Sequence, residues 1–159
     1  MKRLFRFILI AVLLSAALYI GSRFFYQPSE PVEPVIPDIV ETIDYEGSYT
    51  SKEDVALYLI TYGELPHNFV TKKEARKLGW VPSKGNLQEV CEGCSIGGDY
   101  FTYREEEGLP YKKGRNYYEC DIDYNGGTRN AKRIVFSDDG LIYYTGDHYK
   151  TFELLYGEP

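Results

Sequence analysis

The sequence predicts an α+β fold in which N-terminal helices pack on a C-terminal antiparallel β-sheet. Helical periodicity with start signals is confined to the first part of the folded region, and the apolar period changes from 3.6 to 2 residues after Gly97-Gly98. Two of the later apolar segments are joined by the hairpin signal Asp138-Asp139-Gly140. Helices followed by a run of strands are typical of the α+β class.

The N-terminus differs in composition from the rest of the chain. Three basic residues lead into a charge-free apolar run from Phe7 to Ser22. A positive flank before such a run predicts an export signal, yet the run is shorter than the roughly 20 residues that span a bilayer, and no clean Ala-x-Ala cleavage site follows. We therefore expect residues 1–26 to be a signal peptide or an N-terminal membrane anchor.

The composition of the next segment is typical of a spacer. Residues 27–37 contain four prolines, a composition that favours extended chain. Residues 38–159 then form the folded domain. The chain is too short for two full domains, and its 43% hydrophobic and 16% aromatic content excludes a disordered polymer.

The net charge of the folded part argues against a protein whose whole surface binds polyanions. The whole chain has a net charge of -6, and from Asp38 onward 14 basic residues face 22 acidic ones. A site for an anionic partner must therefore be local, because a few clustered cations can focus a positive potential within an acidic protein.

Three segments combine a capping-box start signal with short helical patterns. The expected helices are Ser51 to Tyr62 (start Thr50 with Glu53, end Gly63), Thr71 to Leu78 (Thr71 with Glu74), and a short helix from Asn86 (Asn86 with Glu89).

Four segments predict strands: Tyr117 to Tyr124, Arg133 to Ser137, Leu141 to Thr145 and Phe152 to Leu155. In the first of these, apolar residues alternate with Glu119, Asp121 and Asp123. Because successive side chains of a strand point to opposite faces, one face is expected to be apolar and the other to carry three carboxylates.

The carboxylate face of this strand contains the first candidate catalytic residues. Residues i and i+2 of a strand lie about 7 Å apart, so Glu119 and Asp121 repel each other unless cations lie opposite. Arg129 and Arg133 follow in the sequence, and His148 comes later. A Glu and a His can remove and deliver a proton near neutral pH, while arginines hold a phosphate. The pattern alone does not separate this set from an exposed strand carboxylate and a loop histidine.

From about Val55 to Leu155 the chain resembles the barnase/binase family of secreted bacterial guanyl-preferring ribonucleases. The resemblance rests on motifs that occur in the family's order along a hundred residues: Leu78-Gly79-Trp80-Val81, Ser83-Lys84-Gly85-Asn86-Leu87, Ser95-Ile96-Gly97-Gly98-Asp99 and Asp147-His148-Tyr149. It implies the microbial ribonuclease fold, which is the α+β arrangement expected above.

The resemblance implies a role for each charged candidate. Glu119 matches the general base that takes the proton of the ribose 2′-OH, and His148 matches the general acid that protonates the leaving 5′-oxygen. Lys72, Arg129 and Arg133 match the cations that hold the scissile phosphate. The implied reaction passes through a 2′,3′-cyclic phosphate to a 3′-phosphate and needs no metal ion and no cofactor.

Other matched positions are expected to support the site. Asp121 matches a carboxylate that pairs with the arginines, and Tyr149, next to the acid, is expected to line the base or phosphate pocket. Arg115 and Asp139 match a structural ion pair without a catalytic role.

Base selection is expected from the loop that runs from Phe101 to Glu105. The resemblance implies that Glu105 accepts from the guanine N–H groups while Arg104 helps to hold the ring. This chain has one residue more than the family before Leu109, so Glu106 competes for the role of Glu105.

The three cysteines have no counterparts in barnase. Cys120 is expected on the core face of its strand as a small buried hydrophobe. Cys91 and Cys94 form a C-x-x-C motif, for which a local disulfide, a zinc site and a redox pair are alternatives. In an exported protein the disulfide is favoured.

The sequence thus predicts an extracellular or membrane-anchored endoribonuclease that cleaves single-stranded RNA after guanosine as a monomer. The resemblance also implies a barstar-like intracellular inhibitor as a partner. Two alternatives remain: a catalytically silent module that binds RNA or protein, and a toxin effector domain that uses the same chemistry.

Overall fold

The computed structural model describes residues 42–102 and 108–159. The elements along the chain are α2 (Lys52–Tyr62), β1 (Phe69–Val70), α3 (Lys72–Lys77), the 3-10 helix η1 (Pro82–Lys84), α4 (Leu87–Val90), β2 (Ser95–Phe101), β3 (Tyr117–Asp121), β4 (Arg133–Ser137), β5 (Ile142–Thr145) and β6 (Glu153–Tyr156). The predicted leader and linker lie outside the described residues. Within the described ranges, no helix has the length and apolar character needed to cross a membrane.

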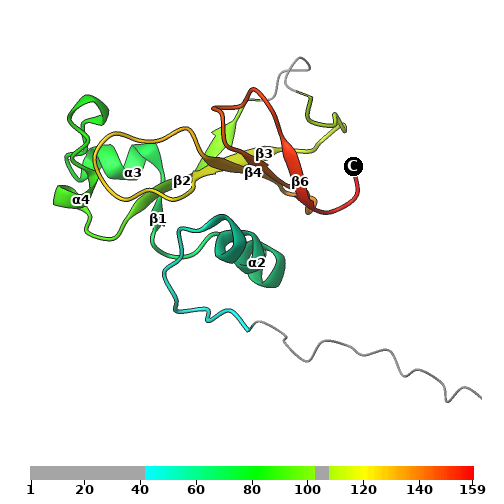
Figure 1. Cartoon of the computed structure of the whole chain (residues 1–159), viewed down its shortest axis with the longest axis horizontal. Coiled ribbons are helices and arrows are strands. Elements are labelled where there is room, and N and C mark those ends of the chain that lie inside the picture. The colour runs from blue at the N-terminus through cyan, green and yellow to red at the C-terminus, as the bar shows by residue number, and fades with distance from the viewer. Residues whose placement is uncertain (1–41, 103–107) are drawn as a thin grey trace, which may run out of the picture. The chain divides into compact units, whose positions relative to one another are not determined.

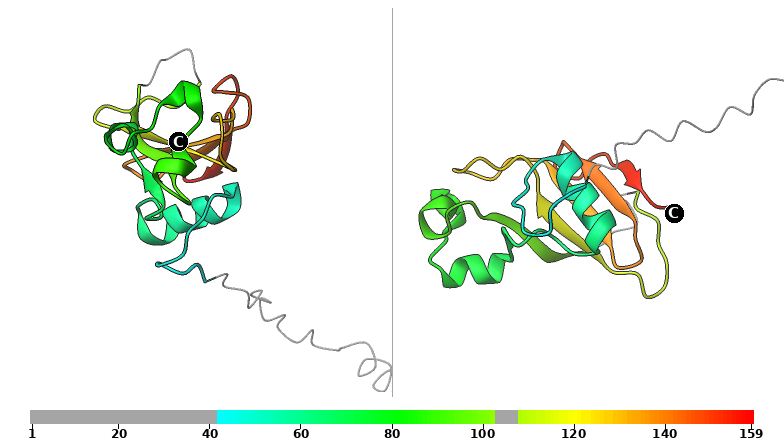
Figure 2. Two further views of the ribbon diagram at one scale, coloured as in Figure 1. Left: turned by 90° about the vertical axis from the view of Figure 1, so that its left-hand side faces the viewer. Right: turned by 90° about the horizontal axis from the view of Figure 1, so that it is seen from below.

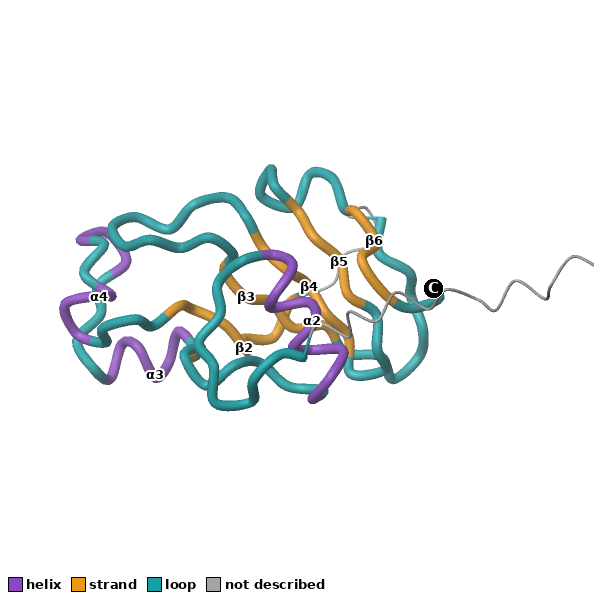
Figure 3. Tube along the Cα trace, turned by 60° about the horizontal axis from the view of Figure 1, so that its bottom comes forward, coloured by secondary structure: helices purple, strands orange, loops and turns teal. Residues whose placement is uncertain are grey.

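One six-stranded sheet organises the domain, with its strands side by side in chain order (Figure 1). β1 and β2 pair in parallel, and the remaining neighbours pair antiparallel. Helix α2 packs across one face of the sheet, whereas α3 and α4 gather beyond its β1–β2 end (Figures 2 and 3). The predicted α+β class is confirmed.

Helix α2 begins one residue later than predicted. The Ser51 side chain caps it by accepting from the Asp54 backbone N–H at 3.1 Å. Thr50, the expected cap, instead has its carbonyl oxygen bonded by the Asp123 N–H at 2.8 Å. The predicted end at Gly63 is confirmed, with a left-handed φ of 73° that suits glycine.

The second capping box is confirmed and the third is wrong. At α3, Thr71 accepts from the backbone of Glu74, whose carboxylate accepts in turn from the Thr71 N–H. At α4, Asn86 makes no capping bond. Its side chain is engaged elsewhere, since it accepts from the Val81 N–H and donates to the Gly79 carbonyl.

Strand β2 and its parallel partner β1 were not predicted. β2 contains Gly97 and Gly98, which are poor strand formers, and the register shifts at this point between Gly97 and Asp99. Glycine is required there because a Cβ on Gly97 would lie 2.6 Å from the Phe69 side chain and 2.7 Å from the Cys120 Cβ. The bulge thus breaks the two-residue periodicity that would mark a strand in the sequence. The absence of a side chain at Gly97 lets Phe69 and Cys120 pack closely against the strand.

Strand β3 divides the core into two layers. Its even-numbered residues face α2, where Cys120 joins Leu59 and Ile134 in the main apolar cluster. Its odd-numbered residues face the opposite side, where Tyr117 packs with Phe101 and Tyr143. The predicted alternation is therefore confirmed over five residues. The strand ends at Asp121 and not at the predicted Tyr124, which belongs to a third cluster under α3 and α4.

The last strands agree with the prediction within one residue. β4 has the expected bounds, and the hairpin after Ser137 leads into β5. β5 begins at Ile142 instead of Leu141, and β6 runs one residue later than predicted. On β2 to β5 the odd-numbered residues Phe101, Tyr117, Val135 and Tyr143 share one cluster on the side away from α2.

Candidate active site

A polar cleft of about 530 Å³ lies on the sheet face away from α2. Its lining residues come from α3, β2, β3, β4 and the two loops that flank β4 and β5: Lys72, Tyr100, Phe101, Thr102, Glu119, Arg129, Arg133, His148 and Tyr149. Seven of these nine are residues that the sequence singled out. The structure thus brings segments that are up to 77 residues apart into one cleft.

Glu119 is the buried carboxylate of the cleft, with 7% of its surface exposed. The Lys72 ammonium donates a hydrogen bond to one of its oxygens, and the Tyr149 hydroxyl donates to the other. Burial raises the pKa of the carboxyl, but these two hydrogen bonds outweigh it and hold the pKa below its ordinary value. Glu119 is therefore ionised at neutral pH, and its two donors fix its orientation.

Asp121 anchors both arginines beneath the cleft. Its side chain is fully buried. Arg129 donates to its two oxygens in a bidentate pair at 2.6 Å each, and the Arg133 Nε lies 2.9 Å from Oδ1. The Arg133 Nε makes no hydrogen bond, so its contact with Asp121 is an ion pair only. Asp121 thereby compensates two guanidinium groups that would otherwise be costly to bury.

His148 stands on a constrained loop after β5. It and Tyr149 both have left-handed backbones, with φ of 60° and 67°, a conformation rarely adopted by residues other than glycine. Asp147 holds the loop by accepting four hydrogen bonds of 2.7 to 3.0 Å, two of them from Thr151. These bonds, the Thr151 hydroxyl first, lower the pKa of Asp147 to about 2. The exposed His148 ring lies beside that of Tyr149 at a tilt of 53°, with centroids 4.8 Å apart.

Sequence reasoning missed the residue that places Lys72. Asp99 accepts a hydrogen bond of 2.8 Å from the Lys72 backbone N–H, and it pairs across the strands with Glu119. It also missed Tyr100 and Thr102, which line the cleft. All three lie on or next to β2, so predicting that strand would have revealed their position.

Two predicted guanine-binding residues, Arg104 and Glu105, lie outside the described residues, as does Glu106. Phe101 is described, and it lines the cleft with its ring centroid 5.3 Å from that of Tyr149. The base-binding assignment therefore stays a prediction for this loop.

The remaining sequence candidates lie away from the cleft. Cys91 and Cys94 are joined in a disulfide, and Cys120 is buried as a free thiol whose pKa burial raises. Arg115 and Asp139 form the expected ion pair at 2.8 Å. Across residues 42–102 and 108–159, no cluster of three or more His, Cys, Asp or Glu side chains is arranged to hold a metal ion.

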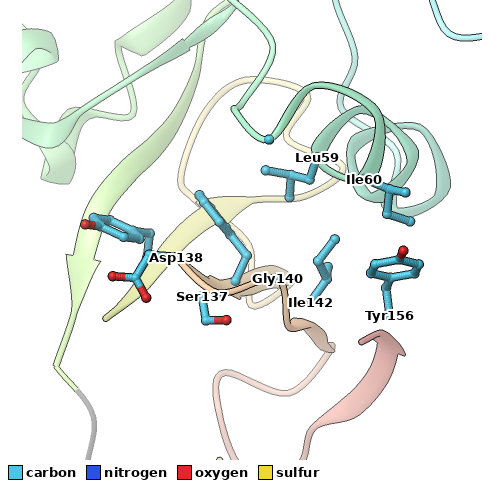
Figure 4. Close-up of a pocket in the computed structure, with 10 residues that line it drawn as sticks. Leu59, Ile60, Ser137, Asp138, Gly140, Ile142 and Tyr156 are labelled. Atoms are coloured by element: carbon cyan, nitrogen blue, oxygen red, sulfur yellow. The ribbon is translucent and has the colours of Figure 1, made fainter. Parts of the chain in front are cut away.

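A second pocket, of about 440 Å³, lies on the α2 side of the sheet. Leu59 and Ile60 of the helix face Ile142 and Tyr156 of the strands across it (Figure 4). No Lys, Arg or His lines this pocket. Acid–base chemistry on an anionic substrate therefore belongs to the polar cleft on the opposite face.

Comparison with known proteins decides the family. A family model described as ribonuclease matches residues 52–156, which is more than half of the chain. The chain belongs to the ribonuclease family. The resemblance stated from its sequence is thereby confirmed, and the matched region contains every described residue of the polar cleft.

Relatives of this ribonuclease occur in bacteria and fungi. It is 57% identical over 100 residues to a ribonuclease of Heyndrickxia coagulans, covering 63% of this chain and 91% of that protein. A ribonuclease of Bacillus intermedius is also 57% identical over 100 residues, covering 63% of this chain and 61% of the relative. Guanyl-specific ribonuclease C2 of Aspergillus clavatus is 40% identical over 65 residues, which span 34% of this chain and 49% of the relative.

Proposed function

We propose that this ribonuclease is a guanyl-preferring endoribonuclease that cleaves single-stranded RNA by transesterification, without a metal ion. The observation that carries the proposal is the pairing, in one cleft, of an ionised buried carboxylate with a histidine and three cations. Membership of the ribonuclease family and the similarity to a guanyl-specific ribonuclease support it.

In the first step, Glu119 removes the proton of the ribose 2′-OH. Its lowered pKa keeps it ionised and ready to accept that proton at neutral pH. The 2′-oxygen then attacks the phosphorus, and the bond from phosphorus to the 5′-oxygen of the next nucleotide breaks. His148 donates a proton to this leaving oxygen, so the products are a 2′,3′-cyclic phosphate and a free 5′-OH.

The cations stabilise the charge that grows on the phosphate during this step. Lys72, Arg129 and Arg133 lie around the same cleft, and donors that are already oriented lose little energy to reorganisation at the moment of reaction. Asp121 and Asp99 hold them in place. In the second step His148 removes a proton from a water molecule whose oxygen attacks the phosphorus. The bond from phosphorus to the 2′-oxygen breaks, and the protonated Glu119 returns a proton to that oxygen, which leaves a 3′-phosphate.

The guanine preference is proposed from the loop after β2. Phe101 supplies an aromatic ring to the lining of the cleft, and Arg104 and Glu105 follow it in the sequence. The free energy of base selection would come from Glu105, because a carboxylate accepts from both N–H groups of the guanine edge, a pattern that adenine lacks.

The cellular setting is proposed from the sequence. Residues 1–26 would export the enzyme or anchor it to the outer face of a membrane, and a monomer would act there. A barstar-like intracellular inhibitor would protect the producing cell by placing acidic groups over the cations of the cleft. A toxin effector would use the same chemistry, whereas a silent binding module would have no need for a held carboxylate beside a histidine.

The test uses an RNA oligomer that contains a single guanosine, incubated with the purified protein. Mass spectrometry is expected to find one cut, with guanosine 2′,3′-cyclic phosphate at the new 3′ end and a 5′-OH on the other fragment. Cutting at other nucleotides as fast as at the guanosine, or fragments that carry a 5′-phosphate, would contradict the proposal.

A further inference from the structure

We propose that Asn130 is a positioning residue for the reaction, and that its side-chain amide sets the place of the Arg133 guanidinium in the cleft. The inference rests on the proposed function, because it explains how one of the phosphate-binding cations is held. None of the roles implied by the resemblance falls on Asn130, and the residue does not line the cleft.

Asn130 belongs to the loop between β3 and β4, residues 122–132. The loop leaves the sheet and reaches α3 and α4 (Figure 1), where Tyr124 packs in the third core cluster. It contains Gly126 and Gly127, which have left-handed backbones with φ of 92° and 72°. Glycine has more backbone conformations open to it than any other residue. A loop of this composition therefore needs a separate constraint if it is to present a cation at a fixed point.

The Asn130 amide closes this loop at its base. Its Nδ2 donates to the carbonyl oxygens of Ile122 at 2.8 Å and Asp123 at 3.0 Å, directly after β3. Its Oδ1 accepts from the Lys132 backbone N–H at 2.9 Å, directly before β4. One side chain thus ties the two ends of the loop together. These bonds use both donors and the acceptor of an amide, a combination that only Asn and Gln side chains have.

The hydrogen bonds of this clamp continue to the Arg133 guanidinium. The Arg133 Nη1 donates to the Lys132 carbonyl oxygen at 2.6 Å and to the Asn130 Oδ1 at 3.3 Å. The shorter bond is the stronger one, and its acceptor belongs to the residue whose N–H is held by Asn130. Asn130 therefore acts on Arg133 mainly through Lys132 and to a smaller extent directly.

Asp121 alone does not fix the direction of the Arg133 side chain. Its contact with the Arg133 Nε at 2.9 Å is an ion pair without a hydrogen bond. The attraction between two charges depends on their distance, whereas a hydrogen bond weakens steeply when its angle departs from linearity. The directional bonds at Nη1 therefore help to orient the guanidinium toward the cleft.

The same short segment also supports the proposed general acid. The His148 backbone N–H donates to the Ala131 carbonyl oxygen at 3.2 Å, and Ala131 lies between Asn130 and Lys132, which the clamp fixes. Arg129, the other arginine of the cleft, directly precedes Asn130. Loss of the amide is therefore expected to disturb several groups of the cleft at once.

The expected effect falls on kcat. A cation that stabilises charge developing on the phosphate acts in the transition state, and removing such an interaction lowers kcat and kcat/KM equally. A misplacement of about 1 Å costs up to about 100-fold in rate. We therefore expect Asn130→Ala to lower kcat by about 10- to 100-fold, with KM changed by less than about threefold.

The experiment measures kcat and KM for GpA cleavage by the wild type, Asn130→Ala, Asn130→Ser and Asn68→Ala. Asn68 is the matched control, because its amide also clamps a second segment, accepting from the Tyr49 N–H at 3.2 Å and donating to the Tyr49 carbonyl at 3.0 Å. It does not line the cleft. Each rate is divided by the folded fraction, measured by urea unfolding of the same preparation. Both Asn130 variants are expected to lose kcat, and Asn68→Ala is expected to keep the wild-type value.

A double-mutant cycle then asks whether Asn130 acts through Arg133. Arg133→Lys keeps the positive charge and removes the planar fork that Nη1 belongs to. In the Arg133→Lys background, Asn130→Ala is expected to cost at least about threefold less in kcat than it does in the wild type, because changes that act on one group are not additive. A general structural role would give the same factor in both backgrounds.

The outcomes separate the positioning role from the proposed function. Failure of the wild type to cleave GpA after G would overturn the proposed function. Cleavage by the wild type, with folded Asn130 variants that match the kcat of Asn68→Ala, would overturn the positioning role alone. An equal loss in both Arg133 backgrounds, or a loss that falls only on KM, would also overturn it.

Discussion

We expect Asp121 to contribute more to the stability of the fold than an exposed carboxylate does, and Asp121→Asn tests this. The substitution keeps the shape of the side chain and removes one charge. Arg129 and Arg133 then lose their shared anion, and Arg133, whose side chain is only 3% exposed, has little access to water. Removing one partner of a buried ion pair costs about 3–5 kcal/mol.

The cost is measured by equilibrium unfolding in urea at pH 7. With a slope of about 2 kcal/mol per M, the expected loss lowers the midpoint by roughly 2 M. Asp123→Asn is the matched control, because Asp123 pairs with Lys132 near the surface, where the two side chains are 39% and 45% exposed. Exposed pairs contribute about 0–1 kcal/mol, so the control is expected to shift the midpoint by under about 0.5 M.

A midpoint for Asp121→Asn that lies within the range of the control would refute the reasoning. It would mean that the arginines find other partners or water when the carboxylate is lost. Such a result would also remove the argument that Asp121 fixes the cations of the cleft.

Three further predictions follow from the site and its surroundings. Tyr149→Phe removes a hydrogen bond that stabilises ionised Glu119, so the carboxyl pKa rises and the acidic limb of the kcat/KM profile against pH moves to higher pH; an unmoved limb would contradict this. The double variant Cys91→Ser/Cys94→Ser is expected to lose about 2 kcal/mol of unfolding free energy, the entropy cost assigned to a loop this short, and reducing agent should then have no further effect on its urea midpoint. Asp147, with a pKa lowered to about 2, contributes stability that is present above the unfolded pKa of about 3.9 and is lost as pH falls toward 2, so urea midpoints of Asp147→Asn should fall less than those of the wild type over that range.

The sequence revealed the catalytic strand because the strand is regular. Glu119 and Asp121 sit two residues apart in an unbroken alternation, and two arginines follow within reach. His148 was a candidate only by residue type, and the resemblance then added Lys72 and gave His148 its role, because no local pattern connects either residue to that strand. Spacing alone could not have joined them, because their meeting depends on long-range pairing of the sheet.

The parts that the sequence did not predict have physical reasons. β2 was missed because Gly97 and Gly98 serve close packing and a bulge, not strand propensity. Asp99 and Tyr100 were missed with it. The false capping box at Asn86 arose because the same side chain that caps a helix also bridges two backbone groups of a loop.

Some features arise only in three dimensions. Glu119 was open to interpretation as an exposed strand residue, yet it is buried because the loop after β5 folds over it and delivers the Tyr149 hydroxyl. That loop keeps its left-handed backbone through Asp147, whose hydrogen bonds are all local to the turn. The net charge of the chain likewise did not indicate the cleft, because its cations, Lys72, Arg129 and Arg133, are few and are paired with carboxylates.

The measurement that tests the central claim most directly is the rate of GpA cleavage in EDTA for the wild type, Glu119→Gln and His148→Gln. The account predicts that EDTA leaves the wild-type rate unchanged, and that each substitution lowers kcat by about 10²- to 10⁴-fold, the usual contribution of a positioned acid or base. A wild-type rate abolished by EDTA, or variants that cleave as fast as the wild type, would contradict it.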